Sequence, residues 1–292
     1  MFKQLGYIFK TMRPRQWPKN IFVLAALVFD GQLFAPHSLL VSSLAVVFFC
    51  LVSSLVYIIN DLVDIEADRQ HPDKRNRPLA SGELTKTWAI GAVVALGLLT
   101  LPTAYFITIP FGLVVSGYFL LMLAYSLWLK HIPLLDVMVI AAGFVLRVAA
   151  GLTVIVVQQF SPWLFVSTTF LALFIALGKR RSEISLLETG AGTHRKVLEG
   201  YSLAFLDQLL IIVVSVTLMT YCLYTFSSSA TSGNYSMMLT IPFVIYPIFR
   251  YLYLVNTKNI GGAPEEIVLS DRPIQISILL WVLTVVLILY LF

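Results

Sequence analysis

The sequence predicts an all-α polytopic membrane protein. Of its 292 residues, 59% are hydrophobic and 12% are charged, whereas soluble domains carry about 25% charged residues. The mean hydropathy is +0.87, and apolar stretches of about 20 residues, the length of a membrane-crossing helix, recur along the chain. A transmembrane barrel would instead alternate polar and apolar residues in segments of about ten.

Nine apolar segments are predicted to cross the membrane. Their boundaries are 20–35, 38–59, 86–106, 111–129, 133–157, 162–178, 204–226, 237–254 and 273–291. With the N-terminus inside, all but one of the 20 lysines and arginines fall in inner segments, and the exception, Arg147, lies within the fifth span. Cytoplasmic loops carry such an excess, so we expect a cytoplasmic N-terminus and an outer C-terminus. Almost all the acidic residues share these inner loops, with Asp30 the exception, which places any chemistry on the cytoplasmic side.

Several classes of protein are disfavoured by the remaining composition. The start of the chain lacks the apolar core and cleavage site of a signal peptide, and no linker divides residues 1–292 into separate domains. Cys50 and Cys222 both lie in predicted spans and are expected to be buried hydrophobes. The net charge of +5 reflects the inner loops and requires no nucleic acid. The four histidines, at 37, 71, 131 and 194, lack the spacing of a zinc site or a hydrolase triad.

The inner end of the second span carries a cluster of aspartates. If its helix continues through residue 68, Asp61, Asp64 and Asp68 lie within about 60° of one another, Asn60 adjoins them and Glu66 points away. Three carboxylates on one face repel each other unless a cation lies between them. Mg²⁺ prefers oxygen ligands and is commonly shared between carboxylates and substrate phosphates. The spacing therefore favours a magnesium–diphosphate site over a solvated helix end with incidental acids.

Three basic features are candidate phosphate ligands. Arg147 is costly within a span unless it faces a wet cavity or a partner. It suits phosphate, although Asp136, eleven residues earlier and on roughly the same face, is an alternative structural partner. Lys130 ends the fourth span, where it either binds a ligand or extends to the interface. The basic run at 179–181 is either functional or a topological flank.

Two adjacent motifs resemble the UbiA superfamily of intramembrane prenyltransferases. "NDLVDIEADR" and "HPDKRNRPLASGEL" are similar to its first aspartate-rich motif and basic loop. Further segments resemble its decaprenyl-phosphate phosphoribosyltransferase subgroup, from residue 12 to about 290: "MRPRQWPKN", "YSLWLKHIPLLDV", "GFVLRVAAG", "GKRRSEI", "PFVIYPIFRYLYLV" and "LSDRP". The resemblance implies nine helices around a cavity open to the cytoplasm, in a single UbiA-like domain.

The resemblance also implies a set of site residues. Mg²⁺ is expected on Asn60, Asp61, Asp64 and Asp68, of which Asp64 and Asp68 are expected to be catalytic. The residues expected to bind phosphoribosyl pyrophosphate are Lys19, Tyr57, Lys74, Arg75, Arg77, Lys130 and Arg147. Those expected to bind polyprenyl phosphate are Lys19, Tyr57, Lys130, Arg147, Lys179 and Arg180. For Lys19, interfacial flanking of the first span is the alternative.

The predicted function is Mg²⁺-dependent transfer of 5-phosphoribose from phosphoribosyl pyrophosphate to a polyprenyl phosphate in the inner membrane, with release of diphosphate. Most prenyl-diphosphate-using relatives carry a second aspartate motif after the sixth span. Here that place reads "GKRRSEISLLE", which disfavours the alternative of prenyl transfer to an aromatic or other small acceptor. An ion-coupled transporter is a third interpretation, although the acids lie at one boundary and no repeat is visible. Homo-oligomerisation and the polyprenyl chain length stay open.

Overall fold

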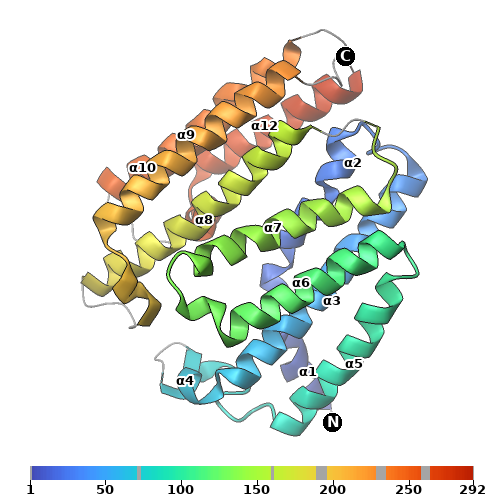
Figure 1. Ribbon diagram of the computed structural model, residues 1–292, viewed down its shortest axis with the longest axis vertical. Coiled ribbons are helices and arrows are strands. Elements are labelled where there is room, and N and C mark those ends of the chain that lie inside the picture. Colours follow the sequence, from blue (N-terminus) through green and yellow to red (C-terminus); the bar gives the residue numbers. More distant parts are fainter. Residues whose placement is uncertain are drawn as a thin grey trace. The chain divides into compact units, whose positions relative to one another are not determined.

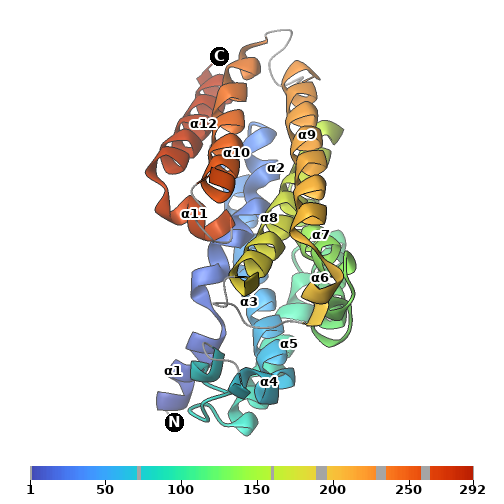
Figure 2. The ribbon, with the colours of Figure 1, turned by 90° about the vertical axis from the view of Figure 1, so that its left-hand side faces the viewer.

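The computed structural model describes residues 2–70, 74–158, 161–188, 196–227, 235–257 and 264–291. Within these ranges the regular elements are helices, and none of the described residues forms a strand. The chain divides into two compact units, and Figures 1 and 2 show its helices coloured along the sequence. The first contains residues up to 27, 32–132 and 146–157, and the second contains 28–31, 133–145 and 158–292. The single-domain expectation stays a prediction.

Eight helices in the described residues are long and apolar enough to cross a membrane. They confirm an all-α polytopic membrane protein, and they coincide with the second to ninth predicted segments. The helices are α3 (Pro36–Val63), α5 (Lys86–Ala104), α6 (Ile109–Leu127), α7 (Leu135–Val154), α8 (Pro162–Glu188), α9 (Leu203–Ser227), α10 (Ile241–Thr257) with the preceding η6 (Ser236–Thr240), and α12 (Arg272–Leu291). His71 and His194 lie outside the described residues.

The first predicted span, 20–35, does not form a long α-helix. Its residues divide between η1 (Pro14–Leu24), a 3₁₀ helix, and α2 (Ala25–Phe29). Pro18 lies inside η1, where it lacks the N–H that an α-helical ladder needs, and residues 30–35 follow α2 as turns and irregular chain. A ninth crossing is therefore not confirmed.

The first unit is built on α3, which contacts α5, α6, η1 and α1 (Phe2–Thr11). Phe49 of α3 lies at its core, 5.2 Å from the Tyr118 ring and 6.3 Å from the Phe111 ring, measured between centroids. At the C-terminal end of α3, three short helices carry polar residues: α4 (Ile65–Gln70), η2 (Lys74–Asn76) and η3 (Leu129–His131). The apolar packing thus holds the end of α3 beside the segments that carry its charged neighbours.

A glycine allows η1 to lie directly against α7. A Cβ atom at Gly151 would collide with the carbonyl oxygen of Val23, a backbone atom that no side-chain rotation can remove. The absence of a side chain therefore permits this close approach, which brings Asn20 of η1 beside Arg147 of α7.

In the second unit, α8 packs along α9, and α10 packs against both α9 and α12 (Figure 1). Phe174 and Tyr251 form the centre of this core, with their rings 5.1 Å apart. Two short elements complete the unit, η4 (Lys196–Gly200) and α11 (Pro264–Ser270). Helix α8 continues ten residues beyond the predicted end at 178, so the basic run at 179–181 is helical.

Candidate active site

The aspartate cluster lies at a break between two helices. Helix α3 ends at Val63, Asp64 has φ −93° and ψ 9°, and α4 begins at Ile65. The predicted continuous helix is therefore interrupted. The i to i+4 pattern nevertheless persists, because the Asp64 N–H donates to the Asn60 carbonyl at 2.9 Å and the Asp68 N–H to the Asp64 carbonyl at 2.8 Å. The helical spacing of the three aspartates is thereby kept.

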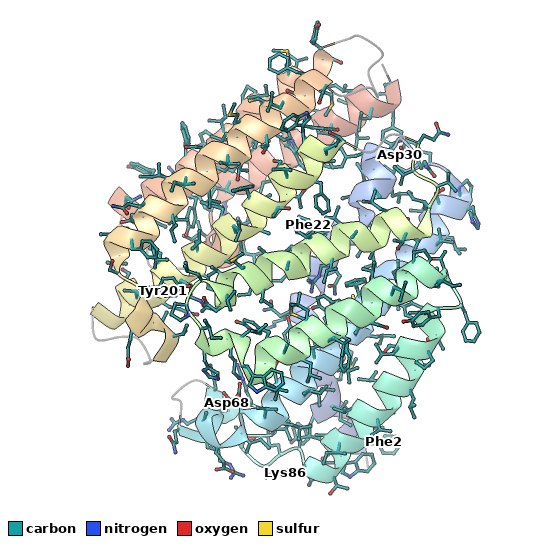
Figure 3. All side chains as sticks on the ribbon, viewed as in Figure 1. Phe2, Phe22, Asp30, Asp68, Lys86 and Tyr201 are labelled. Carbon is teal, nitrogen blue, oxygen red and sulfur yellow. The ribbon has the colours of Figure 1, made fainter. Side chains whose placement is uncertain are left out.

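Asp61 and Asp68 converge on one arginine. Nη1 of Arg77 donates to Oδ1 of Asp61 at 3.1 Å and to Oδ2 of Asp68 at 2.6 Å. The two carboxylate side chains are only 2% and 5% exposed, whereas Glu66 is exposed and pairs with Arg69. Figure 3 labels Asp68, on α4. Two buried carboxylates thus share one cationic group, and the off-face acid points to solvent as predicted.

Asp64 has a different cation, Lys130. The ammonium of Lys130 lies 2.7 Å from both carboxylate oxygens of Asp64. The lysine side chain is 8% exposed and the aspartate 27%. Lys130, placed by η3, therefore points to Asp64 and does not extend to the interface, and its role as a phosphate ligand stays a prediction.

Arg13 is a site residue that the sequence interpretation missed. Its Nη2 lies 2.5 Å from Oδ1 of Asp61, and its guanidinium carbon is 4.8 Å from the centre of the Tyr57 ring. The signal was present in "MRPRQWPKN", where Arg13 stands between an amphipathic stretch and a proline. Sequence spacing alone does not relate it to Asp61, 48 residues later.

Arg147 is buried among polar and aromatic groups of the first unit. Its Nε donates to Oδ1 of Asn20 at 2.8 Å and its Nη2 to the Tyr118 hydroxyl at 2.9 Å. The guanidinium also lies over the Tyr118 ring, 4.8 Å from the ring centre. Asp136, the alternative partner considered from the sequence, uses its two carboxylate oxygens elsewhere, on Tyr201 and Arg180.

Three further predicted phosphate ligands come from the first unit. Lys19 is partly exposed in η1 and directly precedes the buried Asn20. Lys74 and Arg75 lie in η2, three and two residues before Arg77, and Arg75 is exposed. The contacts above bring Arg77 and Lys130 to the aspartates and Tyr57 to Arg13.

In the second unit Arg180 is enclosed by acids. Only 1% of its side chain is exposed. Its Nε donates to Asp136 at 2.6 Å and its Nη1 to Glu183, also at 2.6 Å. The Tyr201 hydroxyl, labelled in Figure 3, donates to the other Asp136 oxygen at 2.5 Å. Burial, followed by this hydrogen bond, raises the pKa of Tyr201 above its ordinary value, so the hydroxyl stays protonated and keeps donating.

The neighbours of Arg180 have different surroundings. Arg181 pairs with Asp207 and Asn256, and Lys179 is partly exposed. The three consecutive bases therefore do not form one uniform cationic surface.

The aspartates fit a divalent cation when a substrate supplies further ligands. Among the described residues, no three Asp, Glu, His or Cys side chains form a ready-made metal centre. The Asp61 and Asp68 oxygens nevertheless already converge on one cationic nitrogen, that of Arg77. One or two carboxylates together with phosphate oxygens and waters make a typical Mg²⁺ site.

Several known proteins are similar to this chain in sequence, and solved structures are similar to it in fold. Residues 20–267 match the UbiA prenyltransferase family. A decaprenyl-phosphate phosphoribosyltransferase of Corynebacterium glutamicum is 37% identical over 96% of this chain and 86% of its own length. The enzyme of the same name from Mycobacterium tuberculosis is 36% identical over 95% of this chain and 92% of its own.

Solved structures support the same fold. A UbiA homolog from Archaeoglobus fulgidus, bound to DMAPP and Mg²⁺, superimposes with a TM-score of 0.71 over 97% of this chain and 98% of that chain, at 20% identity. A structure described for digeranylgeranylglyceryl phosphate synthase covers all of both chains with a TM-score of 0.68, at 18% identity. The family match over residues 20–267, the relatives that match over nearly the whole chain and the shared fold agree. The chain belongs to the UbiA prenyltransferase family.

Proposed function

We propose that this chain transfers 5-phosphoribose from phosphoribosyl pyrophosphate to a polyprenyl phosphate and releases diphosphate. The observation that carries the proposal is the pairing of three aspartates with Arg13, Arg77 and Lys130. A donor with a diphosphate and a further phosphate needs both metal-binding acids and phosphate-binding bases. The shared name of relatives about 36–37% identical over nearly the whole chain supports the same reaction.

The donor would bind at the aspartate cluster with Mg²⁺. Asn60, Asp61, Asp64 and Asp68 would hold the ion, which supplies positive charge beside the leaving diphosphate. Its phosphate ligands would be the residues of the first unit that the sequence predicts for this role: Lys19, Tyr57, Lys74, Arg75, Arg77, Lys130 and Arg147. Guanidinium groups suit this role because their planar donors match pairs of phosphate oxygens.

The acceptor phosphate would bind to Lys19, Tyr57, Lys130 and Arg147, its predicted ligands in the first unit. Lys179 of α8 stays a prediction from the sequence. For Arg180 we propose a positioning role, since its guanidinium already binds two carboxylates. Its buried contacts hold this part of α8, from which the adjacent Lys179 projects.

The chemistry requires charge stabilisation more than proton transfer. The bond between ribose C1 and the diphosphate oxygen breaks, and a bond from C1 to an oxygen of the lipid phosphate forms. That oxygen is already anionic near neutral pH, so no general base is needed. Arg77 and Lys130 would orient the phosphates, and Asp64 and Asp68 would lie close enough to stabilise the cationic character that develops at C1. Preorganised charges of this kind commonly provide much of an enzyme's rate enhancement.

We further propose nine crossings around a cavity that opens to the cytoplasm. Eight helices of crossing length are described, and the first predicted span would be the ninth. The lysines and arginines support this count, because all of them except Arg147 fall on one side of the membrane when nine segments cross. The N-terminus and the active site would then be cytoplasmic and the C-terminus outside.

A transfer assay tests the proposed reaction. Purified protein would be incubated with Mg²⁺, radiolabelled phosphoribosyl pyrophosphate and decaprenyl phosphate, and label would be measured in the organic phase. We expect lipid-linked label that disappears in excess EDTA. A second reaction would offer a prenyl diphosphate with 4-hydroxybenzoate, and we expect no product. Prenylation of the aromatic acid, without phosphoribosyl transfer, would replace the proposal by the aromatic prenyltransferase alternative.

A further inference from the structure

We propose that Arg13 is an exchangeable counter-ion of the metal site. Without metal its guanidinium neutralises Asp61. When a divalent ion takes the Asp61 carboxylate, the guanidinium transfers its charge to a phosphate that arrives with the ion. Arg13 would therefore make the site favour a metal–diphosphate complex over the bare metal. The inference rests on the magnesium site of the proposed function and adds a residue and a binding rule to it.

The backbone at Arg13 directs it to the site. Arg13 has φ 55° and ψ 62°, in the left-handed region, which residues other than glycine rarely occupy. Its N–H donates to the Lys10 carbonyl at 3.2 Å, and its carbonyl accepts from the Gln16 N–H at 2.8 Å. Pro14 follows and begins η1. The chain thus makes a defined turn between α1 and η1, and the side chain at this turn reaches Asp61.

Metal binding and arginine binding compete at Asp61. Its Oδ1 accepts from both Arg13, at 2.5 Å, and Arg77, at 3.1 Å. A carboxylate oxygen has two lone pairs, and these two donors occupy both lone pairs of Oδ1. A metal ion that uses this oxygen must therefore displace one of the two guanidinium groups, and an ion bound through the other oxygen, Oδ2, would still be opposed by both guanidinium charges.

Arg13 is the group better placed to leave. Arg77 is tied by a second contact, 2.6 Å to the buried Asp68, so releasing Asp61 would not let its guanidinium turn to a new ligand. Arg13 instead lies over the Tyr57 ring, 4.8 Å from its centre, and a ring face supports a cation whether or not a carboxylate is also bound. The Arg13 side chain is 27% exposed, whereas that of Asp61 is 2% exposed. The guanidinium can thus turn from the buried carboxylate to an incoming ligand without losing the ring.

The charges explain why phosphate must accompany the metal. A bare divalent ion would enter among Arg13, Arg77 and Lys130 and would be repelled by all three. A diphosphate brings negative charge that offsets this repulsion and gives the released guanidinium a bidentate partner. Each ligand then raises the affinity of the site for the other, which is positive cooperativity between the metal ion and the diphosphate.

Binding measurements on the full-length protein in detergent test this rule without any transfer reaction. Mn²⁺ serves as the probe, alone and with inorganic diphosphate, and bound Mn²⁺ is measured by electron paramagnetic resonance. Arg13→Gln removes the competing charge, and a charged hydrogen bond changes affinity by roughly tenfold or more. We therefore expect Mn²⁺ alone to bind about tenfold tighter and Mn²⁺ with diphosphate about tenfold weaker.

Arg15→Gln is the matched control. It removes the same charge two residues away, from an exposed side chain, and we expect it to change neither affinity by more than about twofold, because an exposed charge is screened by solvent. A purely structural role for Arg13 would weaken both forms of binding together. Unchanged or weaker binding of Mn²⁺ alone in Arg13→Gln would overturn the proposal.

A second variant covers the case in which Arg13→Gln does not fold. Arg13→Lys keeps the charge but replaces the planar fork by a point charge that pairs less tightly with a carboxylate. We expect both affinities to move in the same directions as for Gln, by about threefold, and no movement would overturn the proposal. If wild-type protein binds no Mn²⁺ even with diphosphate, the magnesium site of the proposed function fails instead.

Discussion

At the scale of single residues, the candidate site consists of opposite charges held together before any ligand arrives. Asp61, Asp64 and Asp68 each contact a basic side chain from a different part of the first unit. Such neutralisation explains how acids with little exposure are tolerated at a membrane boundary, where an uncompensated charge is costly.

Asp64→Ala tests the role of the most exposed of these acids. We expect the transfer rate to fall by about two orders of magnitude or more, the usual effect of removing a preorganised charge from an active site. Glu66→Ala is the matched control, since Glu66 lies two residues away, is 73% exposed and pairs only with Arg69 among the ion pairs described. The transfer assay measures both variants, and equal loss in both would contradict the assignment of Asp64.

Arg180 gives a contrasting prediction about stability. Arg180→Met leaves Asp136, which is fully buried, without its guanidinium. Breaking a buried ion pair in this way costs about 3–5 kcal/mol, so we expect a clearly lower thermal midpoint in detergent. Replacing both partners removes the uncompensated charge, and Asp136→Asn combined with Arg180→Met should regain much of the loss. An unchanged thermal midpoint in Arg180→Met would contradict the structural role, and Arg180 would again count as a predicted ligand of the polyprenyl phosphate.

At the scale of elements, short irregular segments place the chemistry that long helices carry. The turn at Arg13, the 3₁₀ helices η1 and η3, and the break at Asp64 each position one charged or polar group. The long helices provide the apolar packing that holds these segments.

Gly151→Ala tests the contact of η1 with α7. The added methyl group would collide with the Val23 carbonyl, and overpacking of this kind typically costs about 1–3 kcal/mol. Gly117→Ala in α6 is the matched control, because a Cβ there meets nothing within 4 Å. Alanine in an open helical position should be neutral or stabilising by up to about 1 kcal/mol. The thermal midpoint should therefore fall in Gly151→Ala and stay the same or rise in Gly117→Ala, and equal midpoints would contradict the close contact.

At the scale of the whole molecule, the number of crossings determines whether the N- and C-termini lie on the same side of the membrane. Eight crossings return the chain to the side on which it began, whereas nine place its ends on opposite sides. The distribution of lysine and arginine favours nine.

Reporter fusions decide this question. We expect fusions after residues 75 and 190 to report the cytoplasm, and fusions after 230 and 292 to report the outside. Fusions after 75 and 190 act as internal controls for the inner loops. A reporter placed at the N-terminus should also report the cytoplasm. An outer signal from it, with 75, 190 and 292 unchanged, would mean eight crossings, with segment 20–35 the one that does not cross. A cytoplasmic signal at 292 would instead mean that a segment between residues 190 and 292 does not cross.

The sequence by itself determined the class of fold, eight of the predicted crossings and the acidic cluster. Hydropathy over about 20 residues is a local property, and the 3.6-residue period relates Asp61, Asp64 and Asp68 within one stretch of chain. The quoted motifs also sufficed for the family, which the comparisons then established.

Only the tertiary structure decided which charges meet. Arg13 binds Asp61, Lys130 binds Asp64, and Asp136 binds Arg180 and Tyr201. The partners in the ion pairs are separated by 48, 66 and 44 residues. Helical periodicity predicted the same face for Asp136 and Arg147, but it does not specify what packs against that face. Partner choice between distant segments depends on how whole helices pack, because many side chains together set which polar groups are brought within hydrogen-bonding distance.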